Sequence, residues 1–144
     1  MRRFQFRLQS VLDWRIVQRD LEEAKLQGLF AEIHRIDAAI EALGREEAEA
    51  ERAVAFSPSV EAQQLTALEE HKRYAGAETG RLRRQRLDCD KRVAAQREKL
   101  VKAERDLRLL ERLKERRLAE WTFEFNREQE ALSSELFLGS WHRG

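Results

Sequence analysis

The chain has 144 residues, with 28 Lys and Arg against 27 Asp and Glu, six Gly, one Pro and one Cys. A charged fraction of 38% with so little Gly and Pro is typical of long helices rather than of a globular core. The net charge of +1 disfavours a dedicated nucleic-acid binder, and the single Cys excludes an internal disulfide and suits a reducing compartment. Since no apolar run approaches the roughly 20 residues that cross a bilayer, and no secretory signal follows Met1, we expect a cytoplasmic protein without direct membrane insertion.

Apolar and polar residues alternate over the first residues, where Phe4, Phe6 and Leu8 follow Arg3, Gln5 and Arg7. Helical periodicity begins directly afterwards, so we expect an extended lead-in and a first helix from about residue 8 to about residue 54. Within that helix one apolar stripe (Trp14, Val17, Leu21) gives way to another, which passes through Leu26, Ile33 and Ile40. The change of frame near residues 24–26 predicts a local change in the supercoil.

The second helix is predicted from an apolar column with heptad spacing. Its members are Leu65, Leu68, Ala75, Leu82, Cys89, Val93, Leu100, Ala103, Leu107 and Leu110. Such a column forms one stripe of a supercoiled helix, and another helix must cover it. Ser57-Pro58 is the one strong helix breaker that precedes it, so we expect a turn at about 55–58, a second helix over about 59–134 and a tail over 135–144.

The two heptad stripes predict an antiparallel pairing about Ser57-Pro58. Predicted partners, for example Ile33 with Leu82 and Leu26 with Cys89, have residue numbers that add to 115, and half of 115 lies between 57 and 58. We therefore expect one all-α domain over residues 1–144, a long antiparallel two-helix coiled-coil hairpin with a longer second helix.

This pairing leaves the end of the second helix without a partner helix. The unpaired part carries Leu118, Trp121, Phe123 and Phe125, and an aromatic surface of this kind indicates a site for a partner protein. Two alternatives stay open: the tail folds back, or the segment with Phe4 and Phe6 covers part of this surface.

No arrangement of residues points to catalysis, a metal or a cofactor. The cysteine and the histidines are scattered, and no phosphate-binding Gly-rich loop occurs, so we predict a protein that is not an enzyme. Cys89 lies in the heptad column and is interpreted as a small core residue. The basic cluster from Arg81 to Arg86 lacks interleaved aromatic residues and is interpreted as a solvated helix face rather than a nucleic-acid site.

Three stretches of the chain share the order and pattern of one known family. They are Phe4 to Asp13 (FQFRLQSVLD), Leu110 to Arg117 (LERLKERR), and Arg127 to Glu130 (REQE) followed by Ser134-Glu135-Leu136. Over nearly the whole length, the chain resembles the FliJ family of flagellar export proteins, with Ser134 where that family usually has Asp.

The resemblance implies a coiled coil similar to the stalk of rotary ATP synthases, placed in the centre of the hexameric flagellar export ATPase. It also implies binding to the cytoplasmic domain of the large export-gate membrane protein and a link to export chaperones. The protein would then lie peripherally at the cytoplasmic face of the inner membrane and serve flagellum biogenesis, motility and chemotaxis.

The site residues follow from the resemblance and from the unpaired aromatic end. Those expected to bind the ATPase are Phe4, Phe6, Leu8, Leu12, Leu113, Arg116, Leu118, Trp121 and Phe125. Those expected to bind the export gate are Tyr74, Ala75, Glu78 and Leu82. Three other functions stay open: an injectisome stalk, a dimerising coiled-coil tether, and a helical hairpin that binds RNA or DNA.

Overall fold

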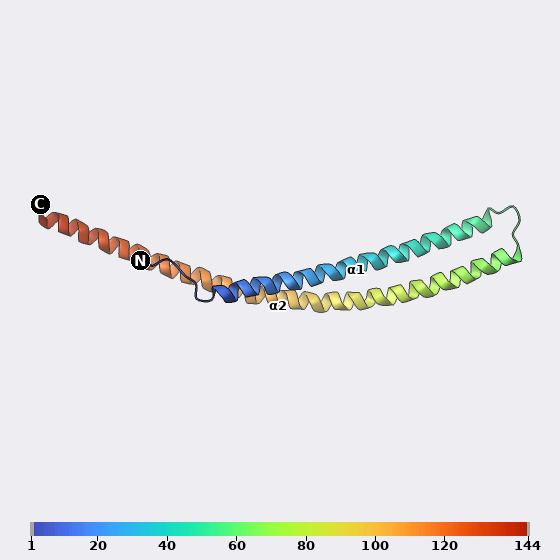
Figure 1. Cartoon of the computed structure of the whole chain (residues 1–144), viewed down its shortest axis with the longest axis horizontal. Helices are drawn as coiled ribbons and strands as arrows, with labels where there is room; N and C mark the ends of the chain where they lie inside the picture. Colours follow the sequence, from blue (N-terminus) through green and yellow to red (C-terminus); the bar gives the residue numbers. More distant parts are fainter. Residues whose placement is uncertain (1, 144) are drawn as a thin grey trace. The chain divides into compact units, whose positions relative to one another are not determined.

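The computed structural model describes residues 2–143 and contains two helices, α1 (Gln9–Ala55) and α2 (Ala62–Arg143). α1 has 47 residues and α2 has 82, and residues 56–61 form the loop between them (Figure 1). The prediction of an all-α hairpin with a longer second helix is confirmed. The start of α1 lies within one residue of the predicted position, and so does its end.

The chain forms two compact units, which are described separately. The loop unit is Glu22–Lys99 and contains the loop between the helices. The terminal unit combines Met1–Leu21 with Leu100–Gly144. Each unit contains one stretch of α1 and one stretch of α2.

In the loop unit the predicted apolar column of α2 forms the core. Ala75, Leu82 and Cys89 are buried at intervals of seven residues, and Cys89 is only 2% exposed. Leu82 and Cys89 form a cluster with Ile36 of α1. The partly buried residues that pack against this cluster are Ile33, Ala39, Ile40 and Leu43. Because each apolar stripe covers the other, both are removed from water, which is the main source of stability in such a pair.

Ion pairs across the loop unit establish its antiparallel direction. Glu51 accepts from Lys72 at 2.8 Å, and farther from the loop Asp37 accepts from Arg86 at 2.6 Å. As the residue number falls along α1, the number of the partner on α2 rises. The two helices run side by side in this unit (Figure 1).

The predicted register is wrong by about one heptad. Asp37 and Arg86 have residue numbers that add to 123, as do those of Glu51 and Lys72, whereas the prediction was 115. The apolar columns match again each time one helix is moved by seven residues, so periodicity alone does not distinguish these registers. One consequence is that Leu65, the predicted partner of Ala50, is 49% exposed near the start of α2.

The predicted start of the second helix is also wrong, because Pro58 and Ser59 belong to the loop. The backbone N–H of Glu61 donates to Oε1 of Gln64 at 3.3 Å, and the N–H groups of Gln64 and Leu65 donate to the carbonyl of Glu61. Glu61 is therefore the N-cap residue, and Gln64 supplies the reciprocal half of a capping box. This cap places the first residue of α2 at Ala62.

The tail predicted over 135–144 is helical as far as Arg143. The predicted end of the second helix, near Ser133 and Ser134, lies inside α2. A serine lowers helix stability only slightly, and Leu136 and Leu138, which follow this pair, are good helix formers.

The terminal unit uses a different stripe of α1 from the one that was predicted. Leu12 of α1 and Leu107 of α2 are buried, and Arg15 pairs with Asp106 at 3.1 Å across the two helices. The predicted stripe of Trp14, Val17 and Leu21 is about half exposed. Arg15 and Arg19 are partly buried, whereas this apolar stripe is exposed, so a prediction based on hydrophobicity selected the wrong face.

Candidate aromatic partner site

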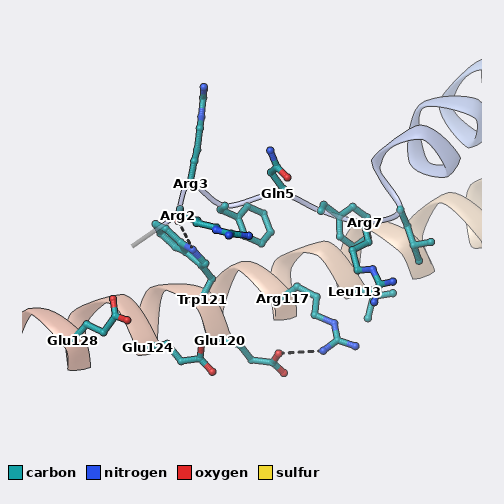
Figure 2. Close-up of a pocket in the computed structure, with 13 residues that line it drawn as sticks. Arg2, Arg3, Gln5, Arg7, Leu113, Arg117, Glu120, Trp121, Glu124 and Glu128 are labelled. Carbon is teal, nitrogen blue, oxygen red and sulfur yellow. Dashed lines mark hydrogen bonds and ion pairs between the residues drawn. The ribbon is translucent and has the colours of Figure 1, made fainter.

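The candidate site lies in the terminal unit, where the N-terminal segment, residues 2–8, runs along α2 (Figure 2). Phe4 and Phe6 are half-buried, whereas Arg3, Gln5 and Arg7 are exposed. This is the alternation expected of an extended strand with one side against a neighbouring element. The predicted extended lead-in is thus confirmed, as is the alternative in which this segment covers part of the aromatic surface.

Trp121 is the centre of the site. Its ring packs against Phe4 with centroids 6.0 Å apart and planes inclined by 58°. On its own helix it stacks on Phe125 at 5.2 Å with an interplanar angle of 12°. Tilted and offset-stacked arrangements are the favoured geometries of aromatic pairs. Three aromatic side chains from both ends of the chain therefore form one continuous cluster.

A hydrogen bond fixes the orientation of the indole. Nε1 of Trp121 donates to the main-chain carbonyl of Arg2 at 3.2 Å, and Figure 2 shows this bond between the indole and the backbone of the N-terminal segment. Trp in a partly buried position generally finds such an acceptor for its one N–H. The role of Arg2 was missed by sequence reasoning, because the acceptor is a main-chain atom and any residue at this position could supply it.

A groove of about 980 Å³ lies beside these contacts and is lined by both the N-terminal segment and α2. Its apolar lining comes from Phe4, Phe6, Leu8, Leu113 and Trp121. Its charged lining comprises Arg2, Arg3, Arg7, Arg117, Glu120, Glu124 and Glu128. We call Leu113, Trp121 and Phe125 of α2, together with the groove beside them, the aromatic face. Its lining combines apolar side chains with charges of both signs, as protein interfaces commonly do.

The predicted ATPase-binding residues are thus divided by the structure. Phe4, Phe6, Leu8, Leu113 and Trp121 line the groove, and Phe125 joins the cluster through Trp121. Leu12 is only 5% exposed in the core, so its side chain does not reach a partner while the helices stay paired. Arg116 and Leu118 are exposed on α2 but do not line the groove.

The predicted gate-binding residues lie in the loop unit and also divide into two groups. Ala75 and Leu82 are buried in the core and face α1. Tyr74 is 61% exposed, and Glu78 accepts a hydrogen bond from Nε of Arg81 at 3.0 Å. This hydrogen bond lowers the pKa of Glu78. Only Tyr74 and Glu78 therefore offer side chains to a partner.

The basic cluster from Arg81 to Arg86 has acidic neighbours in the structure. Arg81 bonds to Glu78, and Arg86 bonds to Asp37 and, at 3.1 Å, to Asp90. The bond to Asp37 raises the pKa of Arg86. Acids that already pair with two of these arginines weaken the field available to a phosphate backbone.

Gln96 is a second residue that sequence reasoning missed. It lies in the α2 column of Ala75, Leu82 and Cys89, yet it is polar and only 7% exposed. Its amide donates to the main-chain carbonyl of Glu22 at 3.0 Å and also contacts the carboxylate of Glu22. Its heptad position was the available signal, because a glutamine in an apolar column is expected to find a cross-helix partner.

In comparisons with known proteins, no family model, no curated protein and no solved structure matches this chain. Within residues 2–143, neither helix contains a stretch with the length and apolar character that crossing a membrane requires. The functional assignment therefore depends on the geometry of the chain and on the motifs in its sequence.

Proposed function

We propose that this chain is a non-enzymatic stalk of the flagellar type III protein export apparatus. In this role it links the export ATPase ring to the export gate and assists the delivery of chaperones and their substrates. It acts in the cytoplasm and associates peripherally with the export apparatus at the inner membrane. The observation that carries the proposal is the aromatic face, because an aromatic cluster that the N-terminal segment covers only in part is suited to hold a partner protein.

The arrangement of the helices supports the same role. A paired helix resists bending, so a position taken by one part of a coiled coil is transmitted along its length without any chemical step. Leu113 of the aromatic face belongs to the LERLKERR stretch, and Phe4, Phe6 and Leu8 of the FQFRL stretch line the groove beside it. These are two of the three stretches on which the resemblance is based. The geometry and the motifs thus indicate the same part of the molecule.

The proposal is tested by capture of the chain on purified flagellar export ATPase. Deleting residues 115–144 removes Trp121 and Phe125, and we expect it to abolish binding while circular dichroism shows that the remaining helices stay folded. The full-length double variant Trp121→Ser/Phe125→Ser should lose binding as well. Phe56→Ser is the matched control, because Phe56 is 84% exposed in the loop and lies outside the aromatic face. Full retention of binding by the double variant contradicts the proposal.

The gate contact is tested separately with the cytoplasmic domain of the export-gate protein. Tyr74→Ser alters an exposed side chain of the loop unit, so we expect weaker gate binding and unchanged ATPase binding. If the native chain and Tyr74→Ser bind the gate domain equally well, Tyr74 is not a gate-binding residue. The same assays are repeated with the ATPase and the gate protein of an injectisome. Stronger binding to these proteins than to the flagellar ones would favour the injectisome stalk.

A dimerising tether is the second candidate function, and exposed apolar residues near the end of α2 favour it. These residues are Leu132, Leu136, Phe137, Leu138 and Trp141. Sedimentation equilibrium separates the two candidates, because a stalk should stay monomeric over a wide concentration range. A tight dimer that Leu136→Ser and Trp141→Ser disrupt would instead support the tether.

A further inference from the structure

The N-terminal segment is held on α2 mainly by its side chains. Among the described residues, its main chain takes part in one bond with α2, from Trp121 to the carbonyl of Arg2. It takes part in two bonds with the start of α1, from the N–H of Gln9 to the carbonyl of Phe6 and from the N–H of Leu12 to the carbonyl of Leu8. Phe4 and Phe6 supply the half-buried apolar contacts. The segment therefore resembles a bound peptide more than a structural element of the fold.

We propose that the aromatic face is a receptor for extended Phe-x-Phe segments that carry basic flanking residues. Residues 2–8 occupy it in cis, as a releasable ligand that a partner presenting the same chemistry displaces. The inference deepens the proposed function by naming the ligand class and the regulation of the same site. It rests on that function only in treating this face as a partner site.

The geometry explains why the ligand is extended and carries two aromatic residues. Side chains two residues apart point to the same side of an extended chain, so Phe4 and Phe6 both face α2 while Gln5 faces away. A helix has no equivalent pair at this spacing, because residues i and i+2 do not share a face. The site thus selects both the spacing and the conformation of its ligand.

The charges around the groove favour a basic ligand. The α2 side of the groove carries Glu120, Glu124 and Glu128, one helical turn apart, and Arg117, which pairs with Glu120 at 3.4 Å. Three acids against one base leave this side acidic, whereas the N-terminal segment carries Arg2, Arg3 and Arg7. Figure 2 shows Arg3 directed away from α2, so Arg3 does not form an ion pair with a glutamate of α2. The attraction instead comes from the summed charges of the two elements. Charge of this kind favours association without locking the segment in place.

Competition in cis gives the inference a measurable consequence. A short connection to α1 holds the segment beside its site at an effective concentration of the order of millimolar, so a free peptide must compete with it. Removing Phe4 and Phe6 from the chain should therefore strengthen the binding of an added peptide by about tenfold or more.

The test uses the full-length chain with Phe4→Ser/Phe6→Ser and a synthetic peptide of residues 2–10. The readout is the indole N–H resonance of Trp121 in nitrogen-15 spectra, assigned with Trp121→Phe. We expect this resonance to move in the double variant, because its acceptor on Arg2 is released, and to return towards its native position as peptide is added. Gln5→Ser is the matched control in the chain, and a peptide with both Phe residues replaced by Ser is the control in solution.

Two results would overturn the inference. The first is a Trp121 resonance that the double variant leaves in place, because the segment would then not be seated on the indole. The second is a resonance that moves in the double variant but does not respond to millimolar peptide, because the face would then not be a receptor. Neither measurement involves the ATPase, so a failure here is distinct from a failure of ATPase capture.

Discussion

The side-chain amide of Gln96 donates a hydrogen bond to the main-chain carbonyl of Glu22 at 3.0 Å. This bond places a polar layer in the loop unit, in a column otherwise occupied by Ala75, Leu82 and Cys89. A polar residue in a coiled-coil seam fixes register at some cost in stability, because a shift by one heptad leaves it without its partner. The apolar columns tolerate such a shift, so Gln96 is the residue that distinguishes the two registers.

Replacing Gln96 by Glu should destabilise the chain by about 1–3 kcal/mol at pH 7, because a second carboxylate is then buried beside that of Glu22. The repulsion raises the folded-state pKa of the new carboxyl, so the penalty should shrink as the pH falls towards about 4. Urea denaturation at both pH values measures this. Gln96→Leu is the control and should change stability by less than about 1.5 kcal/mol. Equal stability of Gln96→Glu and the native chain at pH 7 would contradict the buried placement.

Cys89 gives a second prediction through its titration. Burial, assisted by Glu32, raises the pKa of the Cys89 thiol above its ordinary value of 9.0. A group with a raised folded-state pKa stabilises the fold fully below its unfolded pKa, and this stability is lost as the pH rises through the folded value. We therefore expect stability to be independent of this thiol below about pH 8 and to fall above about pH 9.

The measurement compares the native chain with Cys89→Ala between pH 7 and pH 10.5. The slope of unfolding free energy against pH should be steeper in the native chain, and a thiol reagent should modify Cys89 only after the helices open. Rapid modification under native conditions would show that the residue is exposed.

A third prediction concerns Gly44 in the middle of α1. A Cβ built at this position meets no other atom within 4 Å, and no glycine in the described chain has a positive φ. Gly44→Ala should therefore raise the free energy of unfolding by up to about 1 kcal/mol, since Ala restricts the unfolded chain and favours the helix. Ala38→Gly, at an exposed position of the same helix, should lower stability by a similar amount. A destabilising Gly44→Ala would mean that a neighbour approaches this position closely.

The last turns of α2 give a fourth prediction. All described side chains over residues 126–142 are exposed, so this part of α2 adds helical residues but no buried side chains to the fold. Removing residues 129–144 should lower the helical signal in circular dichroism and change the free energy of unfolding by less than about 0.5 kcal/mol. A loss of several kcal/mol would reveal contacts between this end and the rest of the chain.

Sequence periodicity was sufficient for the class of fold, for the α2 column around Leu82 and for the burial of Cys89. It was insufficient for the axial register, because heptad columns repeat every seven residues. It was also insufficient for the buried face of α1 near Trp14, where Arg15 and Arg19 are partly buried and Trp14 is exposed. The contact of Phe4 with Trp121 appeared only as one of several alternatives. It joins residues at opposite ends of the chain, and no local pattern encodes such a distance.

The antiparallel register is the central claim, because it determines which side chains of α1 and α2 meet. Its most direct test is chemical crosslinking of paired cysteines in a Cys89→Ser background. A short bis-maleimide should join Asp37→Cys to Arg86→Cys within one chain, because these side chains form an ion pair at 2.6 Å. It should not join Asp37→Cys to Glu78→Cys, which is the pair expected if partner residue numbers added to 115. Residue 78 lies about 12 Å from residue 86 along α2. Crosslinking of residues 37 and 78, or crosslinks that form only between chains, would contradict the register.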